Sequence, residues 1–130
     1  MRKKSYCLGL DISSTVVGYC MSTSKKKITE AGYIDIHKEP TIREKAHKVV
    51  RTLEHLDGTP DVIIVEDSLS GFGGGRTSQQ TIVKLAKCNA VISYVTEAIY
   101  ETEVTHVNVS TIRKAVFGKS REKGVDSKQF

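Results

Sequence analysis

The sequence predicts an α/β fold with a mixed five-stranded sheet, in which three antiparallel strands are followed by two parallel strands, flanked by helices. Two observations support this prediction. Residues 6–11 and 62–66 each have the pattern of a buried strand that ends in a carboxylate, at Asp11 and Glu66. The connections between the first three strands are too short for a helix, whereas a segment with helical periodicity precedes each of the last two strands.

The two carboxylates at the strand ends are candidate metal ligands. Open α/β sheets place their chemistry at the carboxyl ends of strands, and an ionised carboxylate is costly in an apolar core. We therefore interpret Asp11 and Glu66 as ligands of a divalent cation rather than as core residues.

Composition and charge limit the class of molecule. The 130 residues, 38% hydrophobic and 27% charged, suffice for one domain with its own core. The 20 Lys and Arg against 15 Asp and Glu give a net charge of +5, which favours an anionic partner. The three cysteines have no Cys-x-x-Cys spacing, so we interpret them as small buried hydrophobes in a reducing compartment and predict no zinc site. No apolar run approaches the roughly 18 residues of a membrane span, and we expect a cytoplasmic protein.

The first three strands should form an antiparallel meander. Only residues 12–15 separate the strand that ends at Asp11 from the next apolar stretch, residues 16–21, and this short connection fits a hairpin. Residues 24–27 form a polar turn, after which residues 30–36 resume as a third strand.

A helix is expected after the meander, because Thr41 and Glu44 have the spacing of a capping box. Six apolar residues then recur at helical spacing on one face: Ile42, Ala46, Val49, Val50, Leu53 and Leu56. The strand at 61–66 follows this helix and should lie parallel to the first strand, which has a free edge. Asp11 and Glu66 should then lie side by side.

Residues 67–78 form a loop that contains four glycines, Phe72 and Arg76. The loop lacks the Gly-Lys-Ser/Thr of a P-loop and matches GxGxxG only in part, so it is not typical of nucleotide binding. A mobile loop with an aromatic residue beside an acidic site suits insertion of an apolar wedge into nucleic acid. A surface loop with Phe72 folded back onto the core is the alternative.

A long helix is expected over residues 78–101, with apolar residues around more than half of its circumference. One sheet face cannot cover all of them, which indicates either a second helix outside this chain or a subunit interface along the helix. Residues 104–109 alternate like a fifth, parallel strand. We interpret His106, in the middle of this strand, as a structural histidine with its hydrogen bonds satisfied.

Basic residues gather after the fifth strand, where only Glu122 and Asp126 oppose them between residues 113 and 128. The six basic residues are Arg113, Lys114, Lys119, Arg121, Lys123 and Lys128. A solvated tail is one interpretation of such a run. Its position after the fifth strand, at the sheet end that carries the acids, favours contact with phosphate.

The order of these elements resembles the ribonuclease H-like superfamily, and within it the chain is similar to the RuvC family of Holliday junction resolvases. The similarity is carried by Leu-Gly-Leu-Asp at 8–11 with Gly18 opening the second strand, and by Val-Ile-Ile-Val-Glu at 62–66 with an aromatic loop after it. It continues through residues 107–114 into the basic stretch and covers nearly the whole chain.

This resemblance implies a structure-specific endonuclease that acts as a homodimer on four-way or otherwise branched DNA in recombination or repair. It also implies hydrolysis of phosphodiesters with two Mg²⁺ or Mn²⁺ ions, for which Asp11 is the bridging and Glu66 a flanking ligand. Phe72, Arg76 and the six basic residues of 113–128 are the expected contacts to DNA.

The sequence departs from the family in two places. Ile12-Ser13 stands where the family commonly has Pro-Gly or a similar small pair. Such nucleases also complete the site with two further acids on a carboxyl-terminal helix, and no such pair occurs before Phe130. We therefore expect residues 1–130 to form a single ribonuclease H-like domain, truncated at its carboxyl end, that binds branched DNA without cutting it.

Two other functions fit parts of the sequence. A non-catalytic relative would keep the fold and the basic surface and bind branched DNA without a complete site. The actin-like ATPase and sugar kinase superfamily also begins with a strand, an acid and a Ser/Thr-rich hairpin, as at residues 11–15. Proteins of that superfamily need two lobes and far more than 130 residues.

Overall fold

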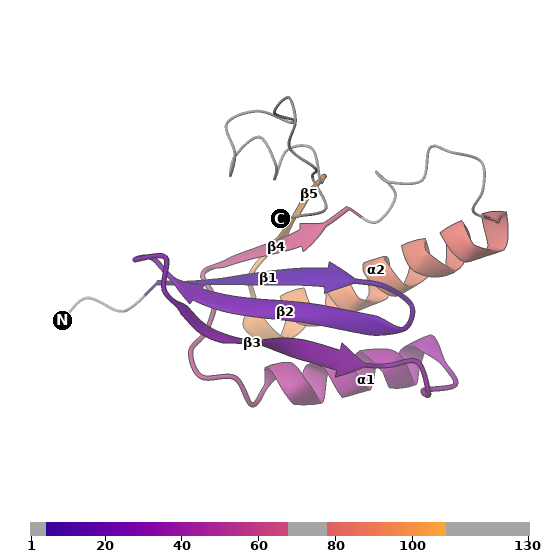
Figure 1. Ribbon diagram of the computed structural model, residues 1–130, viewed down its shortest axis with the longest axis horizontal. Coiled ribbons are helices and arrows are strands. Elements are labelled where there is room, and N and C mark those ends of the chain that lie inside the picture. Colours follow the sequence, from indigo (N-terminus) through magenta and orange to yellow (C-terminus); the bar gives the residue numbers. More distant parts are fainter. Residues whose placement is uncertain (1–4, 68–77, 109–130) are drawn as a thin grey trace, which may run out of the picture.

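The computed structural model describes residues 5–67 and 78–108 of the chain (Figure 1). Its elements are β1 Tyr6–Ile12, β2 Val16–Thr23, β3 Ile28–Asp35, α1 Ile42–Leu53, β4 Val62–Glu66, α2 Gln79–Tyr100 and β5 Val104–Val107. The five strands form one sheet in the order β3-β2-β1-β4-β5. The predicted fold class, three antiparallel strands and then two parallel strands with helices, is confirmed.

The meander follows from two tight turns. β1 and β2 pair antiparallel over their whole length, from Tyr6 with Thr23 to Ile12 with Val17. In the turn between them the Ser13 hydroxyl donates to the Val16 carbonyl at 2.8 Å and accepts the Val16 amide at 3.0 Å. Such a side-chain bond to the local backbone is typical of serine in turns and fixes where the hairpin reverses.

β4 lies parallel to β1, with Leu8 opposite Ile63 and Leu10 opposite Val65. β5 in turn lies parallel to β4, with Val65 opposite His106. Each parallel step needs a crossover connection, and the crossover into β4 contains α1 while the crossover into β5 contains α2. The predicted pairing of β4 with β1 is confirmed, as is the parallel orientation predicted for the fifth strand.

The core lies between the sheet and the two helices, which pack on the same face (Figure 1). Alternate residues of each strand point toward the helices. The fully buried residues of this core come from the strands, from the residue after β3 and from both helices, and include Leu8, Val17, Met21, Ile36, Val49, Leu53, Ile63, Val65, Cys88 and Ile92. Within the described residues no helix covers the opposite face, and we call that side the open face of the sheet.

Helix α1 begins where its capping residues predict and ends earlier than its apolar stripe predicts. The Thr41 side chain accepts the Glu44 amide at 3.1 Å, as an N-cap does. The helix ends at Leu53, and Leu56 lies in the turn that follows, where its amide donates to the Leu53 carbonyl. Gly58, with φ of +91°, completes this turn.

Helix α2 packs on the sheet with a face that is more polar than the sequence indicates. Its buried residues are Cys88, Asn89, Ile92, Ser93 and Thr96. Two of the apolar side chains that the sequence marks, Val83 and Tyr94, are instead 49% and 69% exposed. The outer side of α2 therefore carries part of the excess of apolar residues.

Two smaller expectations concern cysteine and the membrane. All three cysteines are free; Cys88 is buried, and Cys7 and Cys20 are half-buried. Neither of the two described helices is long and apolar enough to span a membrane.

Candidate metal and nucleic-acid site

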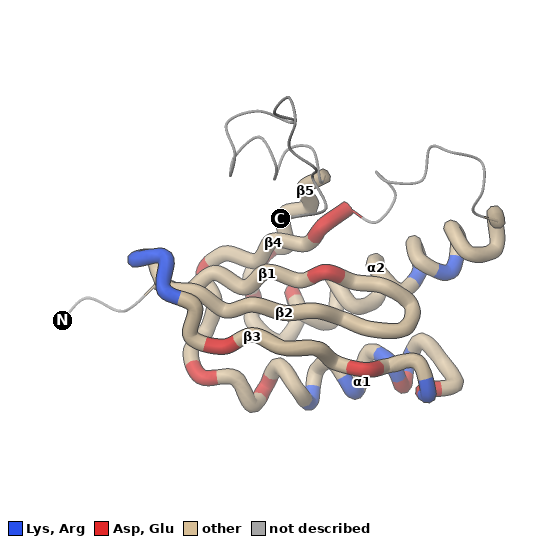
Figure 2. Tube along the Cα trace, viewed as in Figure 1, with Lys and Arg blue, Asp and Glu red and all other residues tan. Residues whose placement is uncertain are grey.

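Asp11 and Glu66 lie next to each other at the carboxyl ends of β1 and β4. Leu10 and Val65 are register partners and point into the core, so the next residue on each strand points to the open face. Adjacent strands are about 4.8 Å apart, which brings the two carboxylates to the same edge. Figure 2 shows acidic residues at these two strand ends. The structure thus brings together the two residues that the sequence singles out.

A groove of about 480 Å³ runs over the open face beside the two acids. Its lining is Gly9, Leu10, Asp11, Gly18, Tyr19, Cys20, Ala31, Gly32, Tyr33, Ile64 and Glu66. A methyl group added at Gly18 would lie 3.8 Å from the Asp11 Cβ and 3.9 Å from the ring of Tyr33. Gly18 therefore leaves open the space between Asp11 and Tyr33, and the Tyr33 ring is 85% exposed.

The chemistry of this edge fits a hard divalent cation. Asp11 is exposed and Glu66 half-buried, so both offer carboxylate oxygen, which Mg²⁺ and Mn²⁺ prefer. Burial raises the pKa of the Cys7 thiol on the same face, and Cys20 beside it raises that pKa further. Because the thiolate is the metal-binding form of cysteine, the raised pKa of Cys7 does not favour a softer metal at that thiol. Residues 5–67 and 78–108 contain no group of three or more potential metal-ligating side chains.

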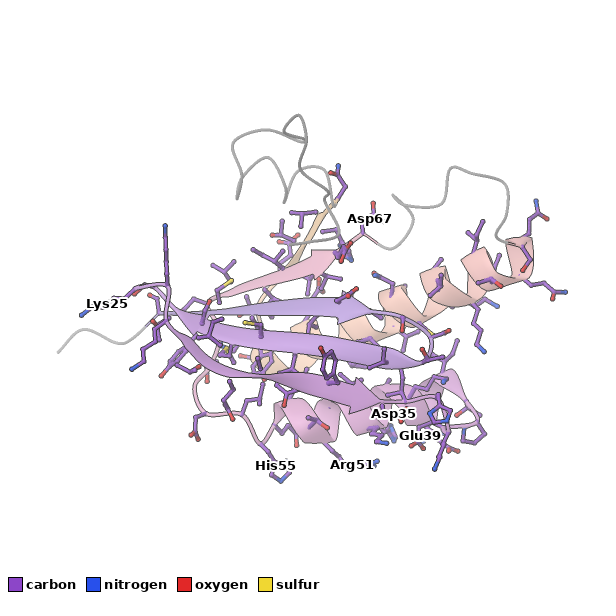
Figure 3. All side chains as sticks on the ribbon, in the orientation of Figure 1. Lys25, Asp35, Glu39, Arg51, His55 and Asp67 are labelled. Atoms are coloured by element: carbon purple, nitrogen blue, oxygen red, sulfur yellow. The ribbon has the colours of Figure 1, made fainter. Side chains whose placement is uncertain are left out.

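The main chain of Glu66 is held by a residue that the sequence analysis missed. The Asn89 side-chain amide on α2 donates to the Glu66 carbonyl at 3.2 Å. One residue further along, the Asp67 amide donates to the Val107 carbonyl of β5 at 2.7 Å, and Asp67 lies at the end of β4 (Figure 3). The signal that could have identified Asn89 is the polar set Asn89, Ser93 and Thr96 on one face of an otherwise apolar helix.

His106 is hydrogen-bonded, as the sequence analysis predicts for a structural histidine. Its Nε2 lies 3.1 Å from the Asn89 Oδ1 and 3.3 Å from the Ser93 Oγ. The ring therefore supports Asn89 from the strand next to β4.

The expected DNA contacts lie outside the described residues. They are Phe72, Arg76, Arg113, Lys114, Lys119, Arg121, Lys123 and Lys128. The hairpin at residues 11–15 carries the resemblance to actin-like ATPases and sugar kinases. Its Ser13 hydroxyl bonds to the backbone of its own turn.

No protein-family model and no curated protein matches the sequence. Among solved structures, Thermus thermophilus RuvC in complex with a Holliday junction substrate has a TM-score of 0.68 and 11% identity, covering 92% of this chain and 73% of that chain. A second Thermus thermophilus RuvC structure has a TM-score of 0.67 and 13% identity over the same shares. These likenesses show that the chain has a ribonuclease H-like fold of the RuvC type.

Proposed function

We propose that this protein is a metal-dependent endonuclease that acts on branched DNA, such as a four-way junction. The observation that carries the proposal is the pair Asp11 and Glu66, placed on adjacent strands at one edge of an open groove. The fold supports the substrate class, because the similar RuvC structure was solved with a Holliday junction.

Asp11 and Glu66 would hold Mg²⁺ or Mn²⁺. A cation bound there supplies an activated water and neutralises charge that develops on the phosphodiester. Without a cation the two carboxylates repel phosphate, so binding of the backbone at this edge depends on them being neutralised. Gly18 keeps the approach to Asp11 free of side-chain atoms.

We assign the DNA backbone to Arg76 and the six basic residues between 113 and 128, and insertion between bases to Phe72. Each phosphate that a cationic side chain neutralises releases counterions, so log K should fall by roughly 0.9 for each contact per tenfold rise in salt. Binding of a labelled junction measured from about 50 to 200 mM salt tests this assignment, and a nearly flat dependence would contradict it.

We also propose an isologous homodimer that packs along the outer side of α2, around Val83 and Tyr94. Large exposed apolar side chains on a helix are typical of an interface, and a symmetric four-way substrate suits a two-fold enzyme. Tyr94→Arg should shift sedimentation from dimer to monomer. Tyr33→Arg, which alters an exposed tyrosine on the open face of the sheet, is the matched control and should remain dimeric.

Cleavage and junction binding, measured side by side with the native gene product, test the proposed activity. Asp11→Asn and Glu66→Gln should abolish cleavage in Mg²⁺ and in Mn²⁺ while junction binding stays equal or tightens, because an amide loses the metal but repels phosphate less. Cleavage retained in either variant would overturn the assignment of the site. Tight junction binding by wild-type protein without cleavage in either metal would instead support a non-catalytic junction-binding protein.

A further inference from the structure

A partly buried hydrogen-bond network joins α2 to the ends of β4 and β5. Asn89 is its centre: its Nδ2 donates to the Glu66 carbonyl at 3.2 Å, and its Oδ1 accepts the Ser93 hydroxyl at 3.4 Å and the His106 Nε2–H at 3.1 Å. Asn89 and Ser93 are only 7% and 4% exposed. The network therefore connects the core of the molecule to the main chain of a candidate metal ligand.

The partners determine which way the Asn89 amide faces. A main-chain carbonyl can only accept, so it requires the NH₂ end of Asn89, while Ser93 and His106 both supply hydrogens to the oxygen end. An apolar side chain at this position of α2 could pack against the sheet but could not bond to the Glu66 carbonyl. A polar group in a core is costly unless its bonds are made, so the network calls for an explanation beyond packing.

The position of the Glu66 carbonyl supplies that explanation. Leu10 with Val65 is the last pair of the β1 and β4 ladder, and Glu66 is one residue beyond it, at the end of β4, where its register partner is Val107 of β5. The Asn89 amide adds an anchor from the helix layer at this residue, and the Asp67 amide adds one from β5. Strand ends fray most readily, so an anchor there decides how steadily the Glu66 carboxylate faces Asp11.

We propose that Asn89 is a positioning residue for the metal site, and that His106 and Ser93 hold its amide in the orientation that anchors Glu66. This inference rests on the proposed function, in which Glu66 binds the cation. Partners that act on a ligand from behind typically change metal affinity by 10- to 100-fold. Because Asn89 acts through the main chain, we expect an effect at the lower end, roughly tenfold.

Asn89→Leu tests the anchor with two measurements. Amide hydrogen exchange of Asp67, read by NMR in metal-free protein, should accelerate, because the end of β4 loses its bond to α2. The dissociation constant for Mn²⁺, measured by electron paramagnetic resonance, should rise roughly tenfold. Thr96→Val is the matched control, because Thr96 is buried on the same helix face but its hydroxyl donates to the Ile92 carbonyl of its own helix. This control should leave both measurements unchanged.

His106 offers a variant that does not disturb the core. His106→Leu removes one of the two donors that orient Asn89 and should reproduce part of both effects. His106→Gln restores an N–H donor near the position of Nε2 and should recover them, which a purely steric role of the ring would not predict. If Asn89→Leu fails to fold, this pair carries the test by itself.

Glu66→Gln separates failure of this inference from failure of the proposed function. If Glu66→Gln weakens Mn²⁺ binding while Asn89→Leu and His106→Leu change neither measurement, Asn89 does not position the site. If Glu66→Gln leaves Mn²⁺ affinity unchanged, the proposed metal site is wrong, whereas faster Asp67 exchange in Asn89→Leu would still support the structural anchor.

Discussion

Neutralising either acid should stabilise the metal-free protein and remove its response to Mg²⁺. Neighbouring strands are about 4.8 Å apart, and two unit charges about 5 Å apart in water repel by roughly 0.8 kcal/mol. The value for water applies because Asp11 is exposed. We therefore expect Asp11→Asn and Glu66→Gln each to raise the metal-free free energy of unfolding by about 0.5–1 kcal/mol. Mg²⁺ at ten times its dissociation constant should stabilise the wild type by about 1.4 kcal/mol and either variant far less.

Urea denaturation followed by circular dichroism, in EDTA and in MgCl₂ with ionic strength matched by KCl, measures both effects. The order of stability should invert, with the variants ahead in EDTA and the wild type ahead in Mg²⁺. Glu103→Gln, which removes an exposed acid just before β5, is the control and should respond to Mg²⁺ like the wild type. If either variant had a free energy of unfolding in EDTA that is lower than that of the wild type by 1 kcal/mol or more, the acids would support the fold rather than a cation. Equal stabilisation of wild type and variants by Mg²⁺ would mean the same.

Three further substitutions test how the fold holds the site. Tyr100→Phe removes the bond from the phenol to the Leu53 carbonyl at 3.0 Å and should cost about 1 kcal/mol at neutral pH. Burial raises the pKa of Tyr100, so the phenol loses its proton at lower pH in the unfolded chain than in the folded one. The free energy of unfolding of the wild type should therefore fall above about pH 10. Urea titrations should find a smaller fall in Tyr100→Phe. The Lys45 side chain is 5% exposed, and its ammonium group donates to two main-chain carbonyls at 2.8 and 2.6 Å. Lys45→Met keeps the buried stem but removes both bonds, so it should lower the free energy of unfolding by about 1–3 kcal/mol. An unchanged melting temperature would contradict this. Gly58→Ala should cost about 1–3 kcal/mol in the same melting experiment, because φ is +91° and the new methyl group would lie 2.7–2.9 Å from the Tyr6 ring.

The sequence by itself determined the antiparallel meander, the pairing of the fourth strand with the first and the place of the two acids. Alternation with period two shows which residues of a strand share a face, and a four-residue connection between residues 11 and 16 leaves room only for a hairpin. Once the strand at 62–66 follows a helix, a parallel partner is required, and the free edge of the first strand supplies it. These are local constraints, so Asp11 and Glu66 could be placed side by side without coordinates.

Only the tertiary structure decided which face of α2 is buried and what holds Glu66 from behind. Hydrophobic periodicity scores each residue alone, and on that measure Asn89 and Ser93 belong outside. Their burial becomes acceptable because Glu66 and His106 supply the hydrogen-bond partners, and these come from β4 and β5, each a separate element of the chain. The environment of a buried polar group is set by such distant partners, which no periodicity along a single helix can show.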